Sequence, residues 1–156
     1  MIESVKGNLL KADAEALVNT VNCIGVMGKG IALQFKQAFP NNFDAYQKAC
    51  KTGEVKPGAM FVFKTGSMFI PKYIINFPTK RHWRDNSKAD DIETGLDALV
   101  QEIKQLNIQS IAMPPLGCGL GGLNWNIVRP MIEKAFEVLP EVRVLLYAPE
   151  VVPLRP

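Results

Sequence analysis

Two glycine-rich segments constrain the fold of this chain more than any other feature. Residues 25–32 (GVMGKGIA) and 114–125 (PPLGCGLGGLNW) each follow a strand-like apolar run and lead into a helix-like segment. Glycine permits positive φ and lets consecutive backbone N–H groups approach an anion, and a following helix adds the positive end of its dipole. Two such loops in one small chain predict a diphosphate held from both sides, as in a nucleotide linked to a sugar.

Length and composition predict one compact domain. With 156 residues, of which 47% are hydrophobic, the chain is long enough to bury about 68–70% of its unfolded surface. We expect residues 1–149 to form this domain and residues 150–156 to form a C-terminal tail. The prolines of the tail are compatible with the start of a linker to a further domain.

The chain gives no indication of a metal site, a disulfide or a membrane segment. Its three cysteines are odd in number and lack C-x-x-C spacing, and its single histidine cannot complete a zinc site with them. The N-terminus has no signal-like apolar core, and no uncharged run reaches membrane-spanning length. We therefore expect a cytoplasmic protein that uses no metal and no cofactor and does not contact a membrane.

Strand-like and helix-like segments alternate along the chain. Apolar, β-branched and aromatic runs predict strands at residues 4–6, 16–21, 59–63, 73–77, 110–113 and 142–147. Apolar side chains at three- and four-residue spacing predict long helices at 89–106 and 126–139 and shorter ones at 31–39 and 42–51. The alternation predicts α/β architecture, a mostly parallel sheet covered on both faces, with one hairpin across residues 61–77.

The second glycine loop contains the G-x-G-x-x-G spacing of dinucleotide-binding folds, at Gly117, Gly119 and Gly122. Its context does not suit such a site. Only one more predicted strand follows, and Glu141 precedes that strand where an acid at its end is expected. Neither loop ends in the Gly-Lys-Ser or Gly-Lys-Thr of a Walker loop. A nicotinamide oxidoreductase is therefore the least favoured nucleotide-based alternative.

Four segments in order resemble the macrodomain family, whose members bind ADP-ribose: residues 5–9 (VKGNL), residues 16–22 (ALVNTVN) and the two glycine loops. The resemblance covers almost the whole chain. It implies a three-layer α/β/α fold around a central mixed sheet of about six strands. Thr79-Lys80 and the later Gly-Cys-Gly-Leu-x-x-Leu-x-Trp pattern are similar to the branch that removes ADP-ribose by means of a lysine.

Within that branch, the segments MGKGIALQF (27–35) and NFPTK (76–80) are most similar to antitoxin macrodomains. This resemblance implies an ADP-ribosyl glycohydrolase that cleaves an N-glycosyl bond and removes ADP-ribose from thymidine bases in single-stranded DNA. It also implies a partner toxin, a DNA ADP-ribosyltransferase, and ADP-ribose as the product. Two alternatives stay open: hydrolysis of ADP-ribosylated protein carboxylates, and a non-catalytic module that only binds ADP-ribose.

The resemblance assigns catalysis to Lys80 and Asn22. A lysine amine becomes nucleophilic when burial or a nearby cation lowers its pKa, and Arg81 and Arg84 are close in sequence. The amine would attack the distal ribose, orient the substrate or protonate the leaving base, and the residues alone leave these roles open. We expect the amide of Asn22 to bind a ribose hydroxyl, with a turn-forming role as the alternative.

Two positions depart from the pattern of the relatives. Asn8 stands where many macrodomains have an aspartate for the adenine amino group, and Gly121 stands where some lysine-type relatives have an aspartate. Without a carboxylate at position 121, a proton must come from water, the substrate, His82 or a distant acid.

We expect the ADP-ribose contacts to come from Gly7, Asn8, Leu9, Gly28, Gly30, Ile31, Ala32, Gly117, Cys118, Gly119, Leu120 and Gly121.

Residues 80–84, Lys-Arg-His-Trp-Arg, combine positive charge with an aromatic ring. This composition suits contact with a phosphate backbone and a stacked base, with a solvated loop as the alternative. The residues to which we assign DNA or base contact are Arg81, His82, Trp83 and Arg84.

Two residues in the glycine loops attract attention but are assigned no chemistry. Loops that bind anions through backbone N–H groups direct their side chains elsewhere, so we expect Lys29 to be solvated. No Cys-His-acid series is identifiable, so we expect the thiol of Cys118 to pack and not to react.

Overall fold

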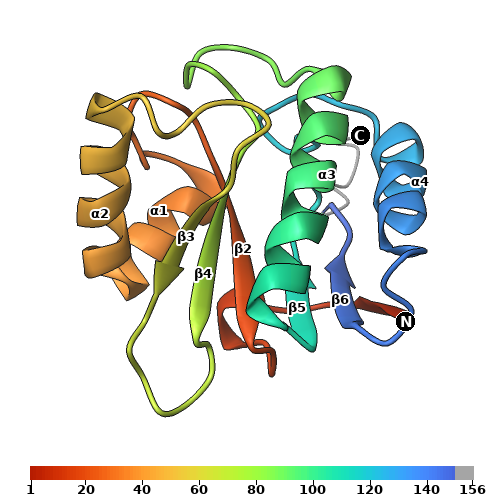
Figure 1. Ribbon diagram of the computed structural model, residues 1–156. Helices are drawn as coiled ribbons and strands as arrows, with labels where there is room; N and C mark the ends of the chain where they lie inside the picture. Colours follow the sequence, from red (N-terminus) through yellow and green to blue (C-terminus); the bar gives the residue numbers. More distant parts are fainter. Residues whose placement is uncertain (150–156) are drawn as a thin grey trace, which may run out of the picture.

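The computed structural model describes residues 1–149, which form a six-stranded sheet flanked by helices (Figure 1). The strands are β1 (Ile2–Val5), β2 (Ala16–Val21), β3 (Phe61–Lys64), β4 (Tyr73–Pro78), β5 (Ser110–Met113) and β6 (Arg143–Tyr147). The helices are α1 (Gly30–Ala38), α2 (Pro40–Lys51), α3 (Ala89–Leu106) and α4 (Trp125–Phe136), with a short 3-10 turn at Leu9–Lys11. The predicted tail, residues 150–156, lies outside the described residues. Among residues 1–149, no helix has the length and apolar character needed to cross a membrane.

The sheet is mixed, as predicted. Its strand order is β1-β6-β5-β2-β4-β3, and β3 is antiparallel to β4 while the other neighbours are parallel. The antiparallel pair is the predicted hairpin, and the loop that joins its strands spans residues 65–72. β2 and β4 pair over their full lengths, with Ala16 opposite Tyr73 and Val21 opposite Pro78. These two strands therefore end side by side.

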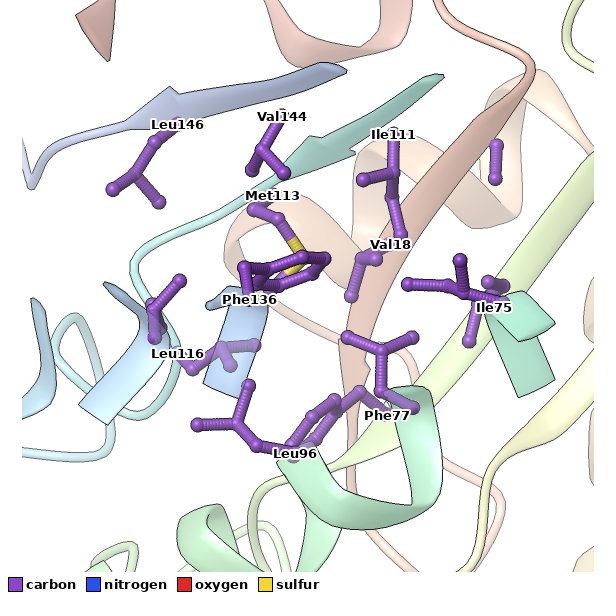
Figure 2. Close-up of a cluster of buried hydrophobic side chains, with 14 of the residues drawn as sticks. Val18, Ile75, Phe77, Leu96, Ile111, Met113, Leu116, Phe136, Val144 and Leu146 are labelled. Carbon is purple, nitrogen blue, oxygen red and sulfur yellow. The ribbon is translucent and has the colours of Figure 1, made fainter. Parts of the chain in front are cut away.

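Alternating side chains of the strands cover the two faces of the sheet. Val18, Ile75 and Ile111 belong to a cluster that α3 and α4 cover, as Figure 2 shows for part of that cluster. Their chain neighbours Leu17 and Ile74 point to the opposite face and pack in a second cluster with α1. Successive residues of a strand point to opposite faces, so an apolar run buried on both sides produces three layers. The predicted α/β/α architecture is confirmed.

The helices that follow β2 and β5 lie on opposite faces of the sheet. β2 and β5 are neighbours, yet β2 leads to α1 on one face and β5 leads to α4 on the other. The two connections diverge at this point and leave a crevice beyond the carboxyl ends of the strands. Open α/β sheets bind their ligands at such a switch point. Both glycine loops are these connections.

Candidate active site

A pocket of about 490 Å³ opens at the carboxyl ends of β2, β4 and β5. It is lined by both glycine loops, by Thr20 and Val21 at the end of β2, and by Pro114 and Pro115 after β5. Its size lies within the range of small-molecule sites. Of the predicted site residues, the structure brings together here Asn22, Gly28, Gly30, Ile31, Ala32, Lys80, Trp83, Gly117, Gly119, Leu120 and Gly121.

The first glycine loop is closed on itself by the side chain of Asn22. The Asn22 Oδ1 atom accepts hydrogen bonds from the main-chain N–H groups of Ile24 at 3.1 Å and Val26 at 3.3 Å. Its Nδ2 atom donates to the oxygen of Val26 at 2.7 Å. Asn22 thus has the turn-forming role given above as its alternative, and one N–H of its amide remains for a ligand in the pocket.

The N-terminus of α1 faces the pocket without a side-chain cap. Its N-cap residue is Lys29, which makes no capping hydrogen bond, and Gly30 begins the helix with φ +60°. The first N–H groups of a helix have no partner within the helix, and they carry the positive end of its dipole. Gly28, Gly30 and Ile31 line the pocket at this end. The arrangement is suited to an anionic group.

The second glycine loop folds tightly on itself across the pocket. Gly117 has φ +71°, and its oxygen accepts from the N–H of Leu123 at 2.9 Å. A Cβ atom at Gly121 would lie 2.4 Å from that same oxygen and 2.3 Å from the Ser87 hydroxyl. The loop therefore leaves no space for a side chain at position 121, which gives a physical reason for the missing aspartate.

Lys80 is placed by a continuation of the sheet beyond its last paired residues. The N–H groups of Thr79 and Lys80 are directed at the oxygen of Val21, at 2.9 and 3.4 Å. The Cys23 thiol lies 3.4 Å from the Lys80 oxygen. The amine of Lys80 reaches across the pocket end and donates to the oxygen of Leu120 at 3.1 Å. Lys80 thus connects the carboxyl end of β2 to the second glycine loop.

The environment of Lys80 lowers the pKa of its amine. Burial is the main cause that lowers its pKa, the carboxylate of Asp85 opposes this change, and the positive charge of Lys29 adds to it. The predicted cations do not supply this effect. Arg81 instead forms an ion pair with Asp91 at 3.3 Å. Lys29, which we expected to be solvated, is exposed but also lines the pocket.

Trp83 stands at the pocket with two partners on its ring. Its side chain is 43% exposed and lines the pocket. The ring of His82 stacks on it at 5.5 Å between centroids, and the guanidinium of Arg84 lies 4.6 Å from its centroid. His82 is also fixed through Nδ1, which accepts from the N–H of Arg84 at 3.1 Å. Of the four residues predicted to contact DNA, only Trp83 lines the pocket.

Four predicted ligand contacts lie outside the pocket lining. Asn8 caps the 3-10 turn through a bond from the Leu10 N–H to its side-chain oxygen at 3.0 Å, as a turn residue does. Leu9 is buried in the core cluster that includes Phe35 of α1. Cys118 packs against the main core, and burial raises the pKa of its thiol to about 11. Gly7 precedes the turn and makes no wall of the pocket either.

The sequence interpretation missed a buried tyrosine behind the first loop and a buried serine behind the second. Tyr46 of α2 donates to both oxygens of Asn22. The N–H of Ser87 donates to the oxygen of Gly121 at 2.9 Å. Both residues are far in sequence from the loops that they support, and neither belongs to a motif, so no pattern in the chain indicates them.

The chain is similar to proteins with established names. A family model described as Macro domain matches residues 18–132. A Mycobacterium tuberculosis protein named DNA ADP-ribosyl glycohydrolase is 58% identical over 149 residues, which are 96% of this chain and 42% of that protein. The chain thus spans about two fifths of the length of this curated relative.

Solved structures agree with these sequence matches. The macrodomain of Mycobacterium tuberculosis DarG has a TM-score of 0.95 and 57% identity, with 96% of this chain and 99% of that chain covered. Thermosipho africanus DarTG in complex with ADP-ribose has a TM-score of 0.89 and 36% identity, with 97% of this chain and 43% of that chain covered.

Proposed function

Since the chain belongs to the Macro domain family, we propose that it is an ADP-ribosyl glycohydrolase that removes ADP-ribose from thymidine bases in single-stranded DNA. The observation that carries the proposal is the contact between the Lys80 amine and the second glycine loop, inside a pocket built for an anion. The name of the Mycobacterium tuberculosis relative supports the same activity.

The diphosphate of ADP-ribose occupies the space between the two glycine loops. The uncapped N-terminus of α1 offers N–H groups and a positive dipole end from one side. The loop of residues 117–122 closes from the other side, where a Cβ atom at Gly30 would lie 3.7 Å from the Leu120 side chain. The close approach of the two loops fits a small, charged group that both loops contact. The Thermosipho africanus relative, whose structure contains ADP-ribose, supports this placement.

The Lys80 amine acts on the distal ribose. The neutral amine attacks the anomeric carbon, and the bond from that carbon to the thymine nitrogen breaks with its electron pair left on the base. The proton that the amine loses balances the proton that the base gains. Water then adds to the sugar–lysine adduct, releases ADP-ribose and restores the amine. Asn22 assists by directing its remaining amide N–H at a ribose hydroxyl.

Trp83 provides the surface for the base. An exposed aromatic ring stacks on any nucleobase, and the neighbouring Arg84 adds a positive charge for a phosphate. The ring lines the same pocket as Lys80, so a base stacked there lies beside the bond to be broken. Arg81 and His82 contact phosphates of the DNA backbone outside the pocket.

The chain also acts, on this proposal, as the antitoxin to a DNA ADP-ribosyltransferase. A Thermosipho africanus relative, 37% identical over 160 residues, is named as a fusion of a DNA ADP-ribosyl transferase with a DNA ADP-ribosyl glycohydrolase. The transferase adds ADP-ribose to DNA and the glycohydrolase removes it, which is the relationship of a toxin to its antitoxin. We place the protein in the cytoplasm, where its DNA substrate lies, with residues 1–149 as the catalytic domain.

The substrate is tested by offering two modified polymers to the same protein. One is a single-stranded oligonucleotide that carries ADP-ribosyl-thymidine, and the other is a peptide that carries an ADP-ribosyl glutamate ester. We expect release of ADP-ribose from the oligonucleotide. Release from the peptide alone, or tight ADP-ribose binding without release from either, contradicts the proposal. Reduction with cyanoborohydride during turnover tests the adduct. The ribose ring of the adduct opens to an imine between its anomeric carbon and the Lys80 nitrogen, and hydride reduces this imine to a stable secondary amine that keeps ADP-ribose on Lys80.

Trp83→Ala is the companion variant. We expect it to slow release from the oligonucleotide while the dissociation constant for free ADP-ribose changes little, because the ring contacts the base. Trp83→Phe, which keeps a stacking surface, serves as the matched control.

A further inference from the structure

Tyr46 lies completely buried on α2, with its hydroxyl against Asn22. The hydroxyl is 2.7 Å from the main-chain oxygen and 2.8 Å from the side-chain oxygen of Asn22, and it shares its one proton between them. Burial raises the pKa of Tyr46 well above its ordinary value, so the hydroxyl is a donor throughout the pH range in which proteins work. Among the described residues, no other donor to the Asn22 main-chain oxygen is present.

The first glycine loop rests directly on the helix that carries Tyr46. Gly25 has φ +90°, and a Cβ atom there would lie 3.3 Å from the Gln47 side chain and 3.8 Å from that of Cys50. Met27, two residues on in the loop, packs in one buried cluster with Tyr46. The loop therefore rests on a face of α2 whose residues do not line the pocket.

We propose that Tyr46 is a positioning residue for the site: its hydroxyl fixes the orientation of Asn22 and, through Asn22, the path of residues 22–26 to the N-terminus of α1. Asn22 lines the pocket, and its amide makes the hydrogen bonds that hold the turn, so that one N–H of the amide is left for a ligand. A small rotation of this amide would turn that N–H away from the ligand. Tyr46 itself makes no wall of the pocket.

The inference rests on the proposed function in taking ADP-ribose as the ligand. It adds that an α2 residue, 24 positions from Asn22 in sequence, sets the geometry of catalysis. A residue that only filled the core would affect stability and leave the chemistry of the folded protein unchanged. A positioning residue lowers turnover of the folded protein, and its effect depends on the presence of Asn22.

The test is a double-mutant cycle with Tyr46→Phe and Asn22→Ala, in which turnover of the modified oligonucleotide and ADP-ribose affinity are measured well below the unfolding temperature. We expect Tyr46→Phe to lower kcat about tenfold, which corresponds to about 1.4 kcal/mol. In the Asn22→Ala background the same change should lower kcat by a clearly smaller factor, because only the bond to the main-chain oxygen of residue 22 is left to lose. Tyr73→Phe is the matched control. Tyr73 begins β4, at the end of the strand away from the pocket, so this change should leave kcat unchanged.

Two results would overturn the inference. One is a Tyr46→Phe variant with the kcat and ADP-ribose affinity of the parent chain. The other is an equal loss of turnover with and without Asn22, which would show that the tyrosine acts by another route. If the parent chain binds ADP-ribose but releases none from DNA, the proposed function fails while the affinity arm of the cycle still tests Tyr46.

Discussion

The Lys80 amine and the Leu120 main-chain oxygen are joined by a hydrogen bond of 3.1 Å. This bond links the end of the β2–β4 pair to the loop after β5, across the point where the sheet connections diverge. The amine is therefore held at the pocket before any ligand arrives. Burial and the charge of Lys29 lower its pKa at the same place. Its position and its lowered pKa together make this amine suited to attack a sugar carbon.

Opposite charge changes near Lys80 should move the pH profile of kcat in opposite directions. If the neutral amine is required, kcat rises with pH and levels off above the pKa of Lys80 in the bound complex. Asp85→Asn removes a charge that raises this pKa, so the rising limb should move to lower pH. Lys29→Met removes a charge that lowers it, so the limb should move to higher pH.

Salt provides the check on this pair of variants, because charge effects at exposed groups shrink as ionic strength rises. For both variants, the shift of the pH profile relative to that of the parent chain should be smaller at the higher of two salt concentrations. A common direction of shift for Asp85→Asn and Lys29→Met would contradict the assignment of the neutral amine.

Cys118 should be almost inert although it lies in a glycine loop. Burial raises the pKa of its thiol to about 11, so roughly one thiol in a thousand is ionised at about pH 8. Alkylation by iodoacetamide, followed by mass spectrometry of the peptide, should be about two orders of magnitude slower than that of free cysteine. At pH values below this pKa, the alkylation rate should rise about tenfold for each unit by which the pH is increased. Rapid labelling at neutral pH would show that the thiol is activated.

Glycine should be required at position 121 and not at position 119. Gly121→Ala puts a Cβ atom against the Gly117 oxygen and the Ser87 hydroxyl, whereas nothing lies within 4 Å of a Cβ atom at Gly119. We expect the free energy of unfolding to fall by roughly 1–3 kcal/mol for Gly121→Ala. For Gly119→Ala it should stay constant or rise by about 0.4–1 kcal/mol, because alanine restricts the unfolded chain. Urea unfolding of the two variants measures this difference, and equal losses would refute it.

Much of the fold was predictable because its signals are local. The 89–106 helix and the 16–21 and 110–113 strands have the predicted bounds, since their apolar spacing is set by the helical and strand periods. Strand ends that depend on pairing with a neighbouring strand differ from the predicted ones. The first strand, predicted at 4–6, is Ile2–Val5 because it follows the register of β6, with Ile2 opposite Val144.

The site was predictable where the backbone itself forms it. The glycine loops and Lys80 meet because each follows the carboxyl end of a neighbouring strand. Side chains that depend on a distant partner were not predictable in this way. Arg81 turns to Asp91 on α3, ten residues later, and Leu9 turns into the core. Both outcomes follow from packing that the local sequence does not express.

The most direct measurement is single-turnover release of ADP-ribose from modified single-stranded DNA by Lys80→Ala, with the ADP-ribose dissociation constant determined on the same sample. On our proposal the diphosphate is bound by main-chain N–H groups of the glycine loops and not by this amine, so we predict affinity within about tenfold of the parent chain and a release rate about 10²- to 10⁴-fold lower. Release at the parent rate by Lys80→Ala would contradict the assignment of Lys80 as the nucleophile.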